Sequence, residues 1–208
     1  MNLRRKNKLV HGFGVNDADY QVYTRVGSVR TICPFYRKWT GMLERCFSEK
    51  LKLKHKTYEG CEVSEEWLSF MSFKRWMELQ DWKGLHLDKD LKVIGNKLYS
   101  KDTCLMLDNI VNQFLNDQKF GVGYFPLGVT FKAETGKFVA RCHAGGVRLH
   151  LGYFDCPYEA ENAYLLKKSE VAMAMALMYD GEIKDSLVRL ASNLKSKIKG
   201  GKCGTSNF

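Results

Sequence analysis

The chain of 208 residues is 45% hydrophobic, enough for a substantial core in one or two domains, and its formal net charge is +10 at pH 7. The excess of Lys and Arg favours a polyanionic partner, most often nucleic acid, over an ordinary solvated basic surface. No apolar run approaches the roughly 18 residues that a membrane span needs, so we expect no membrane partner.

Seven cysteines are spread through the chain, and no two form a Cys-x-x-Cys pair. The chain opens without the apolar stretch of a signal peptide, so we expect reduced thiols and a cytoplasmic protein. Cys46, Cys61 and Cys104 with His55 would make only a scattered zinc site. We do not expect zinc there, because the close ligand pairs typical of zinc sites are missing.

Residues 1–30 form a basic N-terminal segment without clear periodicity. A helix is predicted over 34–47, because Pro34 suits the first turn of a helix and the apolar residues from Tyr36 and Trp39 onward recur on one face. This helix opens the first folded domain, which we expect to cover 31–118.

The Lys-rich stretch 48–60 is predicted to be a loop. A second helix is predicted over 64–82, where Ser64 suits the N-cap and two glutamates follow in the first turn. Its buried surface would come from Trp67, Phe70, Met71, Phe73, Trp76 and Met77.

Residues 84–116 predict the order strand, loop, strand, helix. The alternating stretch 85–89 is the first strand, 90–102 is a loop with a Gly-Asn turn, and 103–107 is the second strand. Asp108 can cap the helix at 109–115. The residues expected to face inward from that helix are Ile110, Val111, Phe114 and Leu115.

Two oxygen-bearing side chains stand at defined places in this order. Asp88 ends the first strand and Asn112 lies one turn into the helix, so we expect them to converge on one side of the unit. Such hard oxygens suit Mg²⁺ or Mn²⁺ held largely by water and a phosphate. Asp90 is a second candidate ligand, or else it fixes the loop by pairing with a lysine. A metal there would polarise a phosphodiester.

The stretch "LDKDLKVIGNKLYSKDTC" followed by "IVNQFL" resembles the HNH (ββα-metal) endonucleases that are common in bacteriophages, and the helices upstream resemble the lead-in helices of that family. The resemblance implies a ββα-metal unit with flanking helices and a metal-dependent phosphodiesterase activity. Asp88, Lys89, His86 and Asn112 would be its catalytic residues.

The chain departs from the family pattern at the general base, where the family carries a histidine and this chain has Lys89. A lysine with an ordinary pKa is protonated at pH 7 and cannot take a proton, although it can bind the scissile phosphate. His86 shares a strand face with Asp88 and is the alternative base, or else a surface histidine without a role. The family's loop-pinning Asn corresponds to Asn96 or Thr103, depending on where the gap is placed.

The second half predicts three strands, at 128–132, 137–143 and 147–153, and a helix from Pro157. In the second strand, Phe138, Ala140 and Cys142 oppose Lys137, Val139, Arg141 and His143. In the third strand, Val147, Leu149 and Leu151 oppose Arg148, His150 and Gly152. This is a three-stranded antiparallel sheet packed on a helix, a basic sheet of the kind that can read DNA in the major groove.

Residues 122–180 resemble the Apetala/ethylene-response-factor DNA-binding domain, through Gly128-Val129, Gly136-Lys137-Phe138, Ala140-Arg141 and Leu151-Gly152-Tyr153-Phe154. By position, the resemblance implies that double-stranded DNA contacts Lys132, Lys137, Arg141, Arg148 and His150. A basic amphipathic helix and a flexible tail are expected over 181–208, and the helix would dock on the sheet domain or mediate self-association.

These features together predict an α+β protein that acts as a sequence-guided, divalent-metal-dependent DNA endonuclease of the homing type. One HNH unit holds one metal, so nicking is expected rather than a double-strand cut. The alternative is a DNA-binding regulator or inhibitor in which the HNH fold no longer cleaves. An RNA-binding protein is less well supported, because no paired aromatic residues mark a sheet face for stacking bases.

Overall fold

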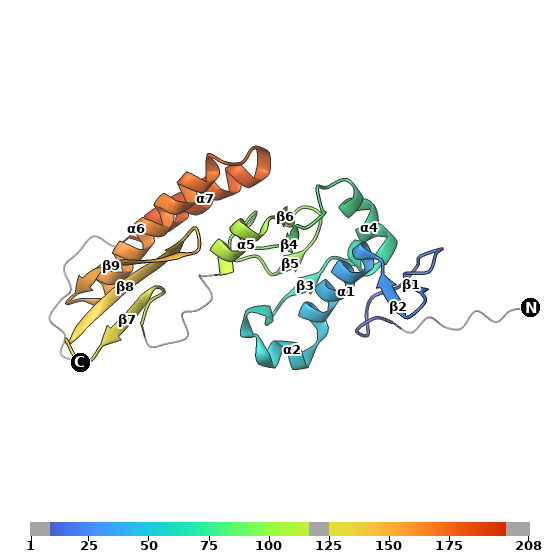
Figure 1. The fold of residues 1–208 in the computed structure, drawn as a ribbon, viewed down its shortest axis with the longest axis horizontal. Helices are drawn as coiled ribbons and strands as arrows, with labels where there is room; N and C mark the ends of the chain where they lie inside the picture. The colour runs from blue at the N-terminus through green and yellow to red at the C-terminus, as the bar shows by residue number, and fades with distance from the viewer. Residues whose placement is uncertain (1–8, 117–124, 199–208) are drawn as a thin grey trace, which may run out of the picture. The chain divides into compact units, whose positions relative to one another are not determined.

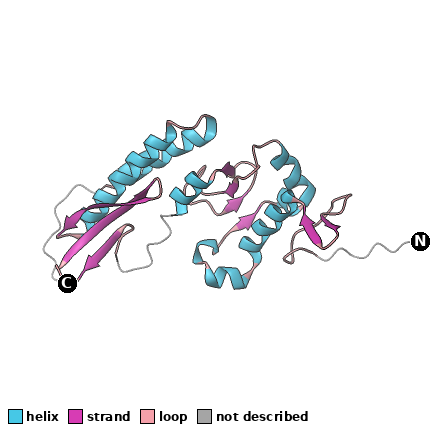
Figure 2. Ribbon diagram, viewed as in Figure 1, coloured by secondary structure: helices cyan, strands magenta, loops and turns pink. Residues whose placement is uncertain are grey.

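The computed structural model describes residues 9–116 and 125–198, and the chain divides into two compact units, 1–106 and 107–208. Both units contain helices and small sheets, so the α+β class predicted from the sequence is confirmed (Figure 1, Figure 2). Within the described ranges, no helix is both long and apolar enough to cross a membrane. The tail that was predicted to be flexible lies outside the described residues.

The first unit opens with an antiparallel hairpin of β1 (Tyr23–Val26) and β2 (Val29–Ile32), which the sequence pattern does not predict. Helix α1 (Pro34–Phe47) begins at the predicted proline. The loop predicted over 48–60 is wrong, because α2 (Glu49–Lys54) and the 3₁₀ turn η1 (Lys56–Tyr58) form there.

The single helix predicted over 64–82 is also wrong, since the structure has α3 (Glu65–Leu68) and α4 (Phe70–Glu78) with a break at Ser69. The Ser69 hydroxyl caps α4 and donates to a carboxylate oxygen of Asp17 at 2.6 Å. The backbone of Val15 forms hydrogen bonds with the residues on both sides of Ser69. Hydrogen bonds from Val15 and Asp17 therefore stabilise the non-helical conformation at Ser69 that separates α3 from α4.

The Ser64 side chain does not cap α3, contrary to the sequence-based prediction. Its hydroxyl is buried without a hydrogen-bond partner. Its backbone N–H donates to the carbonyl of Tyr99 at 3.0 Å and continues the parallel pairing of β3 (Glu62–Val63) with β5 (Leu98–Tyr99). The residue before α3 is thus held by strand pairing and not by a side-chain cap.

Aromatic side chains from α1, α3 and α4 fill the core of the first unit. Trp39, Trp67, Phe70 and Phe73 are fully buried, and the indole N–H of Trp39 donates to the Trp67 carbonyl at 2.7 Å. Burying each of the two phenylalanine side chains contributes roughly 1.5–3 kcal/mol. This core supports the neighbouring two-stranded sheet of β4 (His86–Asp88) and β6 (Leu105–Leu107), both at predicted strand positions.

Helix α5 (Asn109–Asn116) follows β6 and belongs to the second unit. The predicted cap is confirmed, because Asp108 Oδ1 accepts the backbone N–H of Val111 at 2.9 Å. Val111, Phe114 and Leu115 are buried as expected, whereas Ile110 is 55% exposed. The prediction for Ile110 is wrong because it lies beside the buried i, i+3, i+4 stripe of α5 and outside it.

The second unit contains the predicted antiparallel sheet, ordered β7 (Val129–Lys132), β8 (Lys137–Ala144) and β9 (Val147–Phe154). Helix α6 (Pro157–Ala176) packs against it, and Figure 1 shows the helix running along one face of the sheet. The layer between them is apolar and includes Val129, Phe138, Ala140, Leu151 and Ala160.

A bulge in β9 changes which side chains share a face. Ala140 pairs with Gly152 and Arg141 pairs with His150, so Leu151 is the extra residue. Strict alternation, as predicted, would put Gly152 on the face of His150 and Tyr153 on the other. The bulge reverses both assignments, and Tyr153 joins the face of His150.

Helix α7 (Gly181–Ser196) packs along α6, where the Ser169 hydroxyl donates to the Ala191 carbonyl at 2.9 Å. Its predicted apolar stripe is buried at Leu187, Leu190 and Leu194. Helix α5 is tied to the same layer, because the fully buried Lys168 donates from Nζ to the carbonyl of Phe114 at 2.7 Å.

Candidate functional site

The end of β4 holds the acidic residues that the sequence singled out. Asp88 is 8% exposed, and its Oδ1 accepts the backbone N–H groups of Asp90 at 2.9 Å and Leu91 at 2.8 Å. An Asp in this position stabilises the turn that follows the strand. Asp88 therefore stabilises the start of the loop between β4 and β6, in addition to its candidate role as a metal ligand.

Lys89 is an internal residue and not a solvent-facing cation. It is 3% exposed, its Nζ donates to the carboxylate of Asp90 and, at 3.1 Å, to the carbonyl of Asn96, and it lies 5.8 Å from the centre of the Tyr99 ring. A buried ammonium held by a carboxylate and a carbonyl is satisfied where it is. Asp90 pairs with a lysine, one of the two roles that the sequence left open for it.

Asn96 and Thr103 both hold the loop between β4 and β6. The Asn96 amide donates to the carbonyls of Lys89 at 2.9 Å and Leu98 at 2.6 Å, and its oxygen accepts the Leu98 N–H at 3.1 Å. The Thr103 hydroxyl donates to the same Leu98 carbonyl at 2.7 Å. Asn96 makes the more extensive set, since it links both ends of the loop.

We expect Asn96→Ala to destabilise the first unit by about 2 kcal/mol, because the buried groups around Lys89 and Leu98 lose their partners. All four Trp residues of the chain lie in this unit, so their fluorescence during urea unfolding reports on it. Val93→Ala in the same loop is the matched control, because Val93 is exposed. Equal midpoints for the two variants would contradict the role given to Asn96.

The two remaining candidates for catalytic residues, His86 and Asn112, lie far from each other in the sequence. His86 is exposed on β4, two residues before Asp88. Asn112 is half-buried on α5. Asp88 belongs to the first unit and Asn112 to the second, and the positions of the two units relative to one another are not determined. The predicted convergence of these two side chains therefore stays a prediction.

The donor chemistry at Asp88 suits a hard divalent cation. Mg²⁺ binds proteins through one or two carboxylates and keeps water and phosphate as its other ligands. Within the described ranges there is no group of three or more His, Cys, Asp or Glu residues that could hold a metal. Asp90 fits a metal less well than Asp88, because its carboxylate accepts from Lys89.

The thiols near this site are protonated at neutral pH. Burial raises the pKa of Cys104 to about 12, and the nearby Asp88 carboxylate adds to the shift. Burial also raises the pKa of Cys46 to about 12. Cys33, Cys46, Cys61 and Cys104 form no disulfide, as expected, whereas Cys156 is disulfide-bonded, which the expectation of reduced thiols missed.

The residues predicted to bind DNA gather on one face of the sheet. The register and the β9 bulge bring them together on the side opposite α6. We call this surface the basic face, and its members are Lys132, Lys137, Arg141, His143, Arg148, His150 and Tyr153. His143 and Tyr153 were not among the predicted contacts. Alternation along β8 could have indicated His143, whereas Tyr153 depends on the bulge.

Contacts within the basic face hold several of these side chains. Arg141 Nη1 donates to the hydroxyl of Thr130 at 3.2 Å, and Lys132 Nζ lies 5.8 Å from the centre of the Tyr153 ring. Lys137 pairs with Asp155 at 3.0 Å, which lowers the net positive charge at that edge. Arg148 and His150 are exposed. Arg141 and Arg148 are thus the strongest candidates for contacts with an anion.

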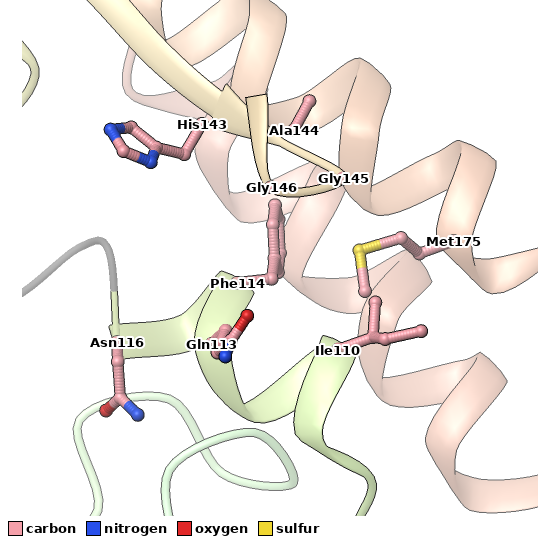
Figure 3. A pocket seen from close by; sticks show the side chains of 9 residues that line it. All are labelled: Ile110, Gln113, Phe114, Asn116, His143, Ala144, Gly145, Gly146 and Met175. Carbon is pink, nitrogen blue, oxygen red and sulfur yellow. The ribbon is translucent and has the colours of Figure 1, made fainter. Parts of the chain in front are cut away.

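A cleft of about 520 Å³ lies beside α5 in the same unit. Figure 3 shows that its lining side chains come from α5, the β8–β9 turn and α6, with Phe114 and Met175 among them. None of the described lining residues is Lys, Arg, Asp or Glu. The cleft therefore lacks the charge expected of a phosphate or metal site, and His143 is the residue that it shares with the basic face.

Comparisons of the chain with models of known protein families, with curated proteins and with solved structures found no match.

Proposed function

We propose that this protein is a divalent-metal-dependent endonuclease of phage or mobile-element type that nicks duplex DNA in the cytoplasm. The observation that carries the proposal is the basic face, where two arginines, two lysines and two histidines gather on the side of one sheet that lies opposite α6. A twisted sheet of this kind can enter the major groove, where arginine reads guanine by forked hydrogen bonds.

In this proposal the second unit selects the DNA and the strand–loop–strand segment of the first unit cuts it. Asp88 would hold Mg²⁺ or Mn²⁺ in this segment, and the metal would supply charge stabilisation at the scissile phosphate. His86 is the candidate base, because it is exposed and lies two residues before Asp88 on the same strand. Lys89 cannot act as a base while it remains buried as an ammonium paired with Asp90.

The buried Lys89 also favours a second candidate function. By the resemblance to HNH endonucleases, Lys89 stands at the position of that family's catalytic histidine, and its buried contacts hold the loop. A unit that kept only this structural role would not cleave. The protein would then be a DNA-binding regulator or inhibitor. Both functions use the basic face, so they differ in cleavage and not in binding.

We expect duplex DNA affinity to fall steeply with salt, because lysine and arginine contacts release counterions from phosphates. The four contacts that the basic face offers, from Lys132, Lys137, Arg141 and Arg148, would contribute about −3.6 to the slope of log affinity against log salt. Fluorescence anisotropy of a labelled duplex between 50 and 300 mM salt, in EDTA to prevent cutting, measures it. An affinity that does not change with salt would contradict the proposal that the protein binds nucleic acid.

A further inference from the structure

The hairpin of β1 and β2 projects from the first unit with both of its faces uncovered. Seven of its eight strand residues are exposed, and only Ile32, at its base, is half-buried and packs on the core. The base is anchored, because the Cys33 N–H donates to the Val22 carbonyl at 2.8 Å and Tyr23 contacts the Tyr36 ring. The rest of the ribbon has no role in the core.

One face of the hairpin carries two arginines placed opposite each other. Arg25 pairs with Arg30 in the register, and like charges in this position destabilise a sheet. Arg30 lies 4.2 Å over the Tyr23 ring, and Arg25 Nε donates to the Gly27 carbonyl at 3.0 Å. Both guanidinium groups are thereby positioned. The sequence from Tyr20 to Cys33 contains no Asp or Glu to neutralise them.

The other face and the tip of the hairpin carry β-branched residues. Val26 and Val29 flank the Gly-Ser turn and are 80% and 64% exposed, and Thr24 pairs with Thr31 behind them. A lone two-stranded ribbon is only marginally stable in water, and exposed valines at its tip add nothing to the core. A partner that covers the ribbon would explain both the paired arginines and the uncovered valines.

We propose that this hairpin is a second DNA-contacting element, a two-stranded ribbon that lies in a groove of duplex DNA with Arg25 and Arg30 on phosphates. The major groove is wide enough for a two-stranded ribbon. Phosphate is the complementary anion for a basic surface without carboxylates. This inference rests on the proposed DNA-binding function, and it concerns a surface separate from the basic face.

Because phosphate contacts carry no sequence information, the hairpin would add affinity for any duplex and would not change the choice of site. Arg25→Ala/Arg30→Ala in the full chain should therefore reduce the salt slope by about 2 and weaken binding at 0.1 M salt by at least about tenfold. The loss should be the same for preferred and random duplexes.

The matched control is Lys50→Ala/Lys54→Ala, which removes the same charge from exposed positions of α2 in the same unit. Anisotropy titrations of wild type, both double variants and Arg25→Lys/Arg30→Lys are compared in EDTA. We expect the control to bind like wild type and the lysine variant to retain the wild-type slope. A second double variant, Val26→Ser/Val29→Ser, should weaken binding without changing the slope.

Three results would overturn the inference. If wild type binds with a steep slope and Arg25→Ala/Arg30→Ala is indistinguishable from it, the hairpin does not contact DNA and the proposed function stands. If the α2 control loses as much affinity as the arginine variant, the effect is one of net charge and not of the hairpin. If wild type binds no duplex at all, the proposed function fails, and the hairpin's role as a DNA contact fails with it.

Discussion

Replacing Asp88 with Ala should abolish metal-dependent nicking, at least a 100-fold loss, while duplex DNA affinity stays within about twofold of wild type. The reason is that the proposal assigns cleavage to the first unit, where Asp88 lies, and DNA binding to the basic face of the second unit. Initial rates of plasmid relaxation and anisotropy titrations measure the two properties separately.

Asp88 also accepts two backbone N–H groups in the loop, so the Ala variant can lose activity through misfolding. Asp88→Asn keeps an acceptor oxygen for those groups and removes the charge that a metal needs. We expect it to fold like wild type by Trp fluorescence and to be as inactive as the Ala variant. Asp81→Asn, an exposed position ahead of β4, should retain full activity. Nicking by Asp88→Asn at the wild-type rate would show that Asp88 does not serve the metal.

Replacing Arg141 or Arg148 with Ala should cost about 1–3 kcal/mol of specific DNA binding for each residue that reads a base. Both lie on a paired strand, and Arg141 is held further by the Thr130 hydroxyl. A guanidinium that is already positioned loses less freedom when it forms a forked hydrogen bond. Competition titrations with preferred and random duplexes separate base reading from phosphate binding.

Lys195→Ala is the control for the arginine variants, because Lys195 is an exposed cation on α7 in the same unit. We expect its affinity to stay close to that of wild type. Specific binding that survives in both arginine variants would mean that the basic face is not the reading surface.

The strands and turns of the second unit could be predicted because each has a recognisable pattern in its local sequence. Alternation in β7 and β8, and the paired glycines before β9, depend only on neighbouring residues. The β9 bulge inserts a single residue, Leu151, and a single insertion leaves no period to detect. The face of Tyr153 therefore required the structure.

The first unit was harder to predict because distant contacts decide it. The break at Ser69 depends on Asp17 and Val15, more than fifty residues earlier in the chain. The β1–β2 hairpin is exposed on both faces, so it has no apolar alternation. For the candidate site, the sequence identified the acidic residues and left Asn96 and Thr103 as alternatives for the residue that holds the loop. It could not indicate that Lys89 is buried against Asp90, since burial depends on the packing of the whole unit.

The most direct test is to incubate the wild-type protein with supercoiled plasmid in Mg²⁺ or Mn²⁺, with EDTA as the control, and to follow the conversion to open circles. The proposed endonuclease predicts open circles with metal, none with EDTA, and little linear product at early times. If duplex DNA is bound but the plasmid stays supercoiled with both metals, the enzyme proposal is contradicted and the non-cleaving DNA-binding protein is the remaining function.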